Sequence, residues 1–230
     1  MQRNNQVDLL LRVLQRFSEA GVLDQCMLIG SWCLHFYRFE FANTDLLPAL
    51  RTMDVDFLIP HPGMIKKSVD VPELLKEEGF IEIMNFSNGL VCYQHPELLV
   101  EFLAPELGRG YHKPRDIRPW QIQAQEIRYL NFLTAYPKKI HYKNMSVCVP
   151  EPGVFALHKL IVSSRRTKED KRKKDLAAAV GVLEFLFKDP KEKARVRAVL
   201  SKIPAKWRKT ILGVSAKHFP ALNEYCEKRS

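Results

Sequence analysis

Two aspartates, Asp54 and Asp56, alternate with Val55 and Phe57 in the short apolar segment MDVDFLI. In a strand, successive side chains point to opposite faces, so this spacing places both carboxylates on one face and both apolar groups on the other. Two like charges side by side on a mostly apolar strand raise the cost of ionising either one. A bound cation would remove that cost, so the segment predicts a cation site.

A glycine and a serine, Gly30 and Ser31, separate the apolar segment QCMLIG from the segment SWCLHFYRF. The first segment predicts a buried strand and the second a helix. A glycine at this junction lets backbone N–H groups approach a ligand closely. The positive end of the helix favours a phosphate there, and Ser31 can add a hydroxyl donor. The alternative is that Ser31 serves only as the helix N-cap.

A third carboxylate, Glu101, shares one strand face with Leu99 and Leu103 in the segment LLVEFLA. If this strand neighbours the strand of Asp54 and Asp56, three oxygen ligands converge. That set suits Mg²⁺ or Mn²⁺, which take a few carboxylates and complete their coordination with water and substrate phosphates. Two such ions about 4 Å apart can activate an attacking hydroxyl and stabilise a leaving pyrophosphate. The alternatives are that the aspartates are water-facing charges of an edge strand and that Glu101 lies on a solvated face.

Basic residues gather further along the chain. Lys159 lies among apolar residues in VFALHKLIVSS, where a lysine requires an anion or a carboxylate partner. The basic run from Arg165 to Lys174 follows it. This run is either a phosphate-binding surface or simply an exposed helix or loop.

The elements that must position these residues follow from the apolar spacing and from Gly and Pro. Predicted helices cover 7–20, closed by Gly21, then 31–39 and 71–79. Predicted strands cover 25–30, 53–59, 80–86, 90–94 and 98–104, with a hairpin over 138–150 that turns at Asn144. Residues 42–51 and 104–120 are expected to be a loop and an irregular segment. After residue 151 the pattern is helical, punctuated by Pro190 and Pro204. We therefore expect an α/β (α+β) domain over 1–150 and a helical domain over 151–230.

The composition is that of a globular protein, with 46% apolar and 27% charged residues and a formal net charge of +10. The positive surplus favours an anionic partner such as a nucleotide or a nucleic acid. The five cysteines form no CxxC pair, so they indicate neither a disulfide framework nor a zinc site. No apolar stretch resembles a signal peptide or a membrane span, so no membrane partner and a cytoplasmic location are expected.

The order of these features resembles the nucleotidyltransferase superfamily related to DNA polymerase β: a Gly-Ser turn, a spacer, Asp-x-Asp on a strand and a later acidic residue. The sequence is most similar to small prokaryotic members, including the nucleotidyltransferase-like toxins of type IV toxin–antitoxin systems. RTMDVD resembles their Arg-x-x-Asp-x-Asp segment, and HKLIVSSRRTKEDKRKKDL resembles their helical half. Two features depart from the pattern. Twenty-two residues separate Ser31 from Asp54, so 42–51 looks inserted, and the third acid is Glu101 rather than aspartate.

The resemblance implies a mixed sheet flanked by helices and followed by a helical C-terminal half. It implies a metal-dependent transfer of a nucleoside monophosphate from an NTP such as ATP to a hydroxyl of RNA (a tRNA end, for example), a protein or a small molecule. In this scheme Gly30 and Ser31 hold the β and γ phosphates. Asp54 and Asp56 bind Mg²⁺ or Mn²⁺, and Glu101 completes a second metal site and helps to deprotonate the acceptor. The cations that neutralise phosphate charge are Lys159, Arg166 and Lys174. The alternative is a non-catalytic, basic RNA-binding or partner-binding protein on a degenerate transferase scaffold.

Overall fold

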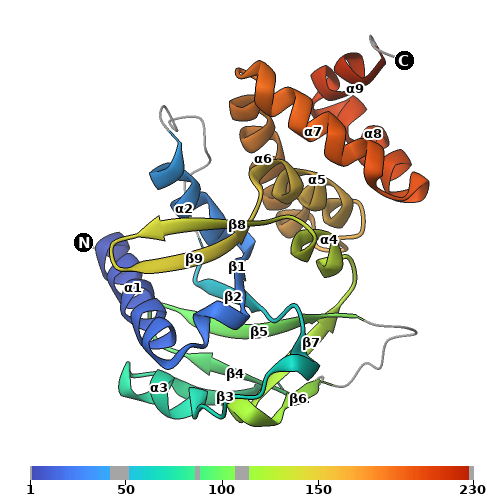
Figure 1. Cartoon of the computed structure of the whole chain (residues 1–230). Coiled ribbons are helices and arrows are strands. Elements are labelled where there is room, and N and C mark those ends of the chain that lie inside the picture. The colour runs from blue at the N-terminus through green and yellow to red at the C-terminus, as the bar shows by residue number, and fades with distance from the viewer. Residues whose placement is uncertain (1, 42–51, 86–88, 107–113, 228–230) are drawn as a thin grey trace. The chain divides into compact units, whose positions relative to one another are not determined.

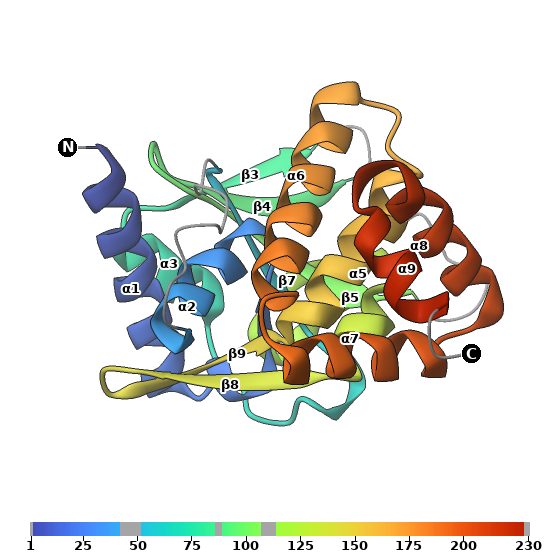
Figure 2. The ribbon, with the colours of Figure 1, turned by 90° about the horizontal axis from the view of Figure 1, so that it is seen from above.

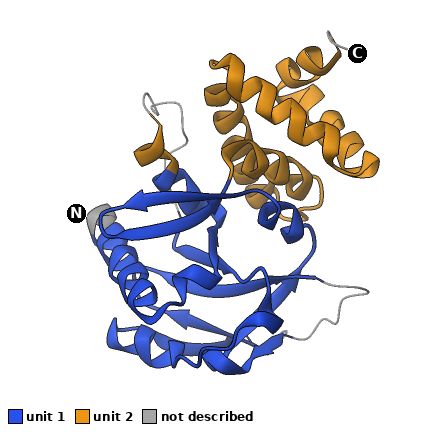
Figure 3. Cartoon of the chain, viewed as in Figure 1, with its two compact units in different colours: residues 1–36, 50–150 blue, residues 37–49, 151–230 orange. Residues whose placement is uncertain are grey.

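The computed structural model of the chain describes residues 2–41, 52–85, 89–106 and 114–227. The chain divides into two units (Figure 3). The first unit consists of residues 1–36 and 50–150, and the second of residues 37–49 and 151–230. The insert predicted at 42–51 lies outside the described residues.

A mixed sheet of seven described strands forms the centre of the first unit (Figure 1). The strand order is β1-β2-β5-β4-β3, with β7 beside β5 and β6 beside β7. β2 runs parallel to β5, and β5 to β7, whereas the other pairs are antiparallel. The strands are β1 Met27–Ile29, β2 Asp54–Leu58, β3 Ile81–Asn85, β4 Leu90–Gln94, β5 Leu99–Pro105, β6 Arg115–Ile117 and β7 Ile122–Ile127. The expected sheet flanked by helices is therefore confirmed.

Helix α1, Gln2–Ala20, covers one face of this sheet. It ends before Gly21, whose φ of +76° is the left-handed conformation that closes a helix. The ring of Phe17 lies 5.2 Å from that of Phe57 on β2 and 6.2 Å from that of Phe102 on β5. Because side chains alternate along a strand, Asp56 and Glu101, which neighbour these rings in sequence, point to the opposite face. The apolar core around Phe17 thus forms on the face opposite Asp56 and Glu101.

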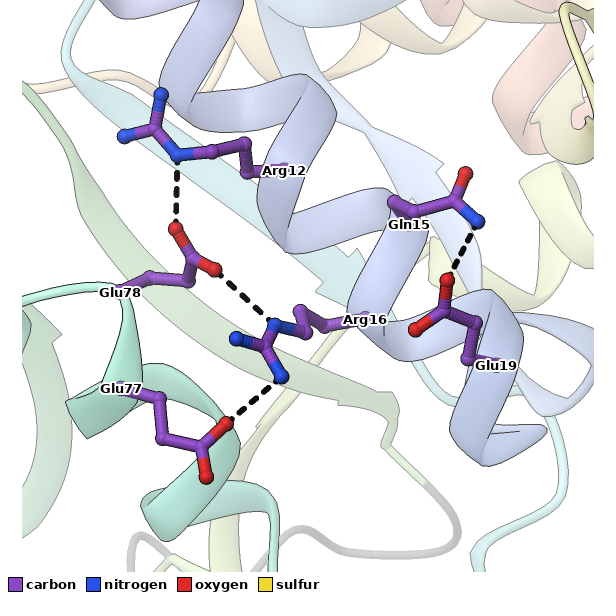
Figure 4. A network of polar contacts seen from close by, with 6 residues as sticks. All are labelled: Arg12, Gln15, Arg16, Glu19, Glu77 and Glu78. Carbon is purple, nitrogen blue, oxygen red and sulfur yellow. Dashed lines mark hydrogen bonds and ion pairs between the residues drawn. The ribbon is translucent and has the colours of Figure 1, made fainter.

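Helix α3, Val71–Glu77, is joined to α1 by a network of ion pairs (Figure 4). Glu78, just beyond α3, accepts from Arg12 Nε at 2.8 Å and from Arg16 Nε at 3.1 Å, while Arg16 also pairs with Glu77 at 2.9 Å. Burial disfavours the charge of Glu78, but the bonds from both arginines outweigh it and lower the pKa of that carboxyl. The two helices are therefore linked by charge as well as by packing.

The expectation that residues 104–120 form an irregular segment is wrong in part, because two strands extend into this range. β5 continues to Pro105, and β6 occupies Arg115–Ile117 as a short partner of β7. β7, with the sequence IQAQEI, was not predicted as a strand, although Ile122 and Ala124 are buried and alternate with glutamines as in a half-buried strand. Its place in the sheet depends on pairing with β5, which no local pattern encodes.

The remaining elements of the first unit are short helices and a separate hairpin. The hairpin pairs β8, Pro137–Tyr142, with β9, Met145–Pro150, as predicted. The helices are α2 Cys33–Glu40, whose end belongs to the second unit, and α4 Leu130–Thr134. The 3₁₀ turns are η1 Leu23–Gln25, η2 Gly30–Trp32, η4 Pro62–Met64 and η5 Arg118–Trp120.

The second unit is helical over the described residues 152–227, as expected for the C-terminal half. Its helices are α5 Pro152–Ser163, α6 Glu169–Leu186, α7 Pro190–Lys202, α8 Ala205–His218 and α9 Pro220–Glu227. The largely buried α5 lies between α6 and α8 (Figure 2). Pro190 is the first residue of α7, and Pro204 precedes α8, positions where a proline costs no helical hydrogen bond.

Candidate active site

The turn at Gly30 lies directly against an aspartate of the neighbouring strand. Gly30 follows β1 with a φ of +71°, a conformation that residues with a Cβ rarely adopt. A Cβ placed on Gly30 would collide with the carboxylate oxygen Oδ2 of Asp56. Pairing of Ile29 with Asp56 between β1 and β2 produces this approach. Glycine is thus required here both by the backbone conformation and by the space that Asp56 fills.

Ser31 lies inside the 3₁₀ turn η2 rather than at its N-cap, which is Ile29 and makes no side-chain cap bond. The alternative that Ser31 serves only as the N-cap of the helix stays a prediction. Helix α2 begins two residues later, at Cys33. Ser31 is half-buried. It lies at the strand-to-helix junction, where a hydrogen-bond donor to a phosphate was predicted.

The two strands that carry the acids are neighbours, which was the condition for a shared site. β2 and β5 pair in parallel, with Asp56 opposite Glu101 and Asp54 opposite Leu99. All three carboxylates therefore belong to one face of the sheet. Asp54 is exposed, whereas Asp56 and Glu101 are half-buried. β2 lies between β1 and β5, so the two aspartates do not belong to an edge strand, but Asp54 does face water as that alternative supposed.

Glu101 has a partner that its own strand does not reveal. The thiol of Cys92 on β4 donates to Glu101 Oε1, with 3.4 Å between Sγ and Oε1. Burial of Cys92, together with the charge of Glu101, raises the pKa of this thiol to about 12, so it stays protonated and remains a donor. The thiol orients one carboxylate oxygen and leaves Oε2 for another ligand.

The donor set fits a hard cation that brings part of its own coordination. Among the described residues, no group of three or more His, Cys, Asp and Glu side chains is close enough to hold a metal ion by itself. Asp56 and Glu101 are nevertheless cross-strand neighbours, and the carboxylate of Asp56 lies at the Gly30 turn. Mg²⁺ is commonly held by one or two carboxylates, with water and substrate phosphates completing the shell. Asp56 and Glu101 fit this requirement as two neighbouring carboxylates, and the joint role of Asp54, Asp56 and Glu101 as metal ligands stays a prediction.

Two of the three predicted cations of the second unit, Lys159 and Arg166, form an ion-paired cluster with Asp175. Lys159 Nζ lies 2.6 Å from Asp175 Oδ1, and Arg166 Nε lies 2.9 Å from Asp175 Oδ2. Burial disfavours the charge of Asp175, but both cations outweigh it and lower the pKa of the carboxyl. Lys159 has therefore found the carboxylate partner that its apolar surroundings require. Lys174 is exposed.

Next to Lys159, His158 is buried, and its Nε2 has no hydrogen-bond partner among the described residues. Burial, reinforced by the charge of Lys159, lowers the pKa of this imidazole to about 3. The ring is therefore neutral at physiological pH and acts as a packing group.

Two residues of these clusters were not predicted from the sequence. Asp175 follows Lys174 in HKLIVSSRRTKEDKRKKDL, the segment that carries the family resemblance, so a signal for it existed. Cys92 has no comparable signal, because its contact with Glu101 depends on the pairing of β4 with β5.

Comparison with known proteins agrees with this geometry. The sequence matches the family described as nucleotidyltransferase over residues 8–201, and the chain belongs to this family. It is an enzyme of the class that transfers a nucleoside monophosphate from an NTP. The likeness to type IV toxins stays a prediction. No curated protein matches the sequence.

Two solved structures are similar to the chain. One is an antigenic nucleotidyltransferase-like protein from Paracoccidioides brasiliensis, with a TM-score of 0.50 and 15% identity over 94% of this chain and 92% of that one. The other is the antibiotic-resistance factor ANT(2'')-Ia, with a TM-score of 0.46 and 10% identity over 98% of this chain and 99% of that one. The first likeness supports the fold. No described helix is long and apolar enough to cross a membrane.

Proposed function

We propose that the first unit catalyses metal-dependent transfer of a nucleoside monophosphate from an NTP to a hydroxyl acceptor. The observation that carries this proposal is the position of Asp56, which lies against the Gly30 turn and opposite Glu101. A triphosphate at the turn would therefore meet the carboxylates that hold its cation.

In the proposed reaction the acceptor oxygen forms a bond to the α-phosphorus, and the bond from that phosphorus to the bridging oxygen of pyrophosphate breaks. The backbone at Gly30 and the hydroxyl of Ser31 hold the β and γ phosphates. Asp54, Asp56 and Glu101 would hold Mg²⁺ or Mn²⁺, which supplies charge neutralisation at the phosphates and at the leaving pyrophosphate. Glu101 accepts the acceptor proton, directly or through water, at the oxygen that Cys92 leaves available.

The test measures pyrophosphate release from each labelled NTP with Mg²⁺ or Mn²⁺, in the presence of total RNA, protein or small hydroxyl compounds. We expect release that requires the metal and an acceptor, and that is lost in Asp54→Asn and Asp56→Asn. Asp24→Asn, an exposed acid outside the site, serves as the control. If Asp56→Asn released pyrophosphate at a rate close to that of wild type, the carboxylates would have no role in the transfer.

RNA is the acceptor class that the charge distribution favours. Residues 151–230 carry twenty Lys and Arg against nine Asp and Glu, a net charge of +11, whereas residues 1–150 carry sixteen against seventeen. The whole positive surplus thus belongs to the helical C-terminal half. One triphosphate, already partly neutralised by its metal, does not need so many cations. The role of Lys159, Arg166 and Lys174 in nucleotide binding stays a prediction from the resemblance.

The same charge favours one rival function, a non-catalytic RNA-binding or partner-binding protein on a transferase scaffold. Pyrophosphate release distinguishes the two functions. If the protein only binds RNA, neither the wild type nor any variant should release pyrophosphate, and Asp56→Asn should retain RNA affinity.

A further inference from the structure

A cavity of about 410 Å³ opens where two strands diverge from the same edge of β5. β2 occupies one edge of β5, so β4 and β7 share the other. β4 pairs with the start of β5, at Leu99 and Val100, and β7 pairs with its end, from Leu103 to Pro105. The volume is within the range of about 300–1,000 Å³ typical of small-molecule sites.

This cavity is separate from the candidate active site. Two of its lining residues, Glu82 and Tyr93, are cross-strand partners, and Tyr93 in turn pairs with Val100. Partners in a ladder share a face, and Val100 alternates with Glu101. Glu82 and Tyr93 therefore belong to the face opposite the carboxylates Asp56 and Glu101.

Tyr93 forms part of the cavity wall. Its side chain is 2% exposed, its ring packs edge-on against Phe102, and its hydroxyl makes no hydrogen bond to a described residue. Burial, and after it the charge of Glu82, raises the pKa of this phenol, so the hydroxyl keeps its proton.

A glutamine bridges the diverging strands and fixes one wall of the cavity. Gln123 Oε1 accepts from the backbone N–H of Val91 at 3.2 Å, and Gln123 Nε2 donates to Asp116 Oδ1 at 3.2 Å. Both ends of the amide are therefore occupied, and the exposed Asp116 has a hydrogen-bond donor within the wall.

The charged groups of the wall are two carboxylates, Glu82 and Asp116, and one guanidinium, Arg118. Neither Glu82 nor Arg118 forms an ion pair with another described residue. The complement of this wall is a small molecule with two cationic groups and one carboxylate. We propose that the cavity binds an α-amino acid with a basic side chain, whose two cations face Glu82 and Asp116 and whose carboxylate faces Arg118.

The probes are L-lysine and three analogues that each lack one of its charges, titrated into the full chain by calorimetry. Cadaverine lacks the carboxylate, 6-aminohexanoate lacks the α-ammonium, and norleucine lacks the side-chain ammonium. We expect L-lysine to bind at least about tenfold more tightly than each analogue, because each lost charge removes a charge-assisted hydrogen bond. Equal affinity for L-lysine and norleucine would overturn the proposal, as would no measurable binding of L-lysine.

Two exposed wall residues provide variants that should fold normally. Glu82→Gln should weaken L-lysine binding at least about tenfold, and Arg118→Gln should do the same while leaving cadaverine affinity unchanged. Asp24→Asn is the matched surface control. Asp56→Asn should bind L-lysine as wild type does, because Asp56 belongs to the other face. This placement would be contradicted if Asp56→Asn lost L-lysine binding, or if Glu82→Gln bound L-lysine as tightly as wild type. Because no step involves nucleotide, these results are independent of the proposed transfer reaction.

Discussion

At the scale of single residues, two constraints at position 30 together admit only glycine. Its φ is +71°, and a Cβ would collide with Asp56. We predict that Gly30→Ala lowers the free energy of unfolding by about 1–2 kcal/mol through the left-handed conformation. Displacement of Asp56 should also reduce nucleotide transfer about a hundredfold.

The matched control for Gly30 is Gly63, where an added Cβ would meet no atom within 4 Å and φ is not positive. Gly63→Ala should leave both stability and transfer close to wild type. The measurements are urea unfolding and pyrophosphate release. If the two alanine variants behaved alike, the Gly30 turn would have no specific role.

Cys92 is a positioning residue for Glu101 in the proposed site. Removing the thiol in Cys92→Ala leaves Glu101 Oε1 without its donor, so the carboxylate loses its fixed orientation. We predict that the Mg²⁺ concentration for half-maximal transfer rises roughly tenfold, as for other residues that orient metal ligands. Cys92→Ser, which keeps a donor, should lie between Cys92→Ala and wild type. A merely structural role would change stability and leave the metal titration unaltered.

At the scale of elements, the pairing of α1 with α3 should depend on pH through Glu78. The folded-state pKa of Glu78 is lower than its ordinary value of 4.5 because Arg12 and Arg16 bond to the ionised form. This carboxyl therefore stabilises the fold above the unfolded pKa, and the contribution is lost as pH falls through the folded pKa.

We predict that Glu78→Gln lowers the free energy of unfolding by about 1 kcal/mol at pH 7, because Glu78 bonds both arginines. The difference from wild type should vanish in acid, once Glu78 itself is protonated. Denaturant unfolding at a series of pH values measures this. Glu73→Gln, whose pair with Lys76 is exposed, is the control and should have a smaller effect. A difference that stayed constant with pH would mean that the charge of Glu78 is irrelevant.

At the scale of the whole molecule, positive charge is concentrated in residues 151–230. If this half binds an RNA backbone, the logarithm of the binding constant should fall by roughly 0.7 per neutralised phosphate for each decade of salt. We predict that Lys173→Ala combined with Lys174→Ala lowers both the affinity and this slope. Both lysines are exposed, and neither belongs to the cluster around Asp175.

The control for this prediction is Lys66→Ala combined with Lys139→Ala, two exposed lysines of the first unit. It removes the same charge from the chain and should change the slope less. Fluorescence anisotropy with a single-stranded RNA at several salt concentrations measures both pairs. Equal effects of the two pairs would indicate a response to net charge alone, without a binding surface in the helical half.

Local pattern alone determined several parts of this protein. The alternation of Asp54 and Asp56 with apolar residues places both on one face wherever their strand lies in the sheet, because side-chain direction has a period of two. Gly30 between a strand and a helix, and the apolar spacing that ends at Gly21, are local in the same sense. The positive charge of the helical half is also a property of the sequence.

Only the tertiary structure decided which of these parts meet. The parallel pairing of β2 with β5 places Asp56 opposite Glu101, and the pairing of β4 with β5 brings Cys92 to the same carboxylate. Lys159 could have required an external anion, but the packing of α6 against α5 supplies Asp175. These outcomes depend on hydrogen bonds and burial between segments distant in sequence. Strand order and register minimise the energy of the whole sheet and its core, so no local pattern can encode them.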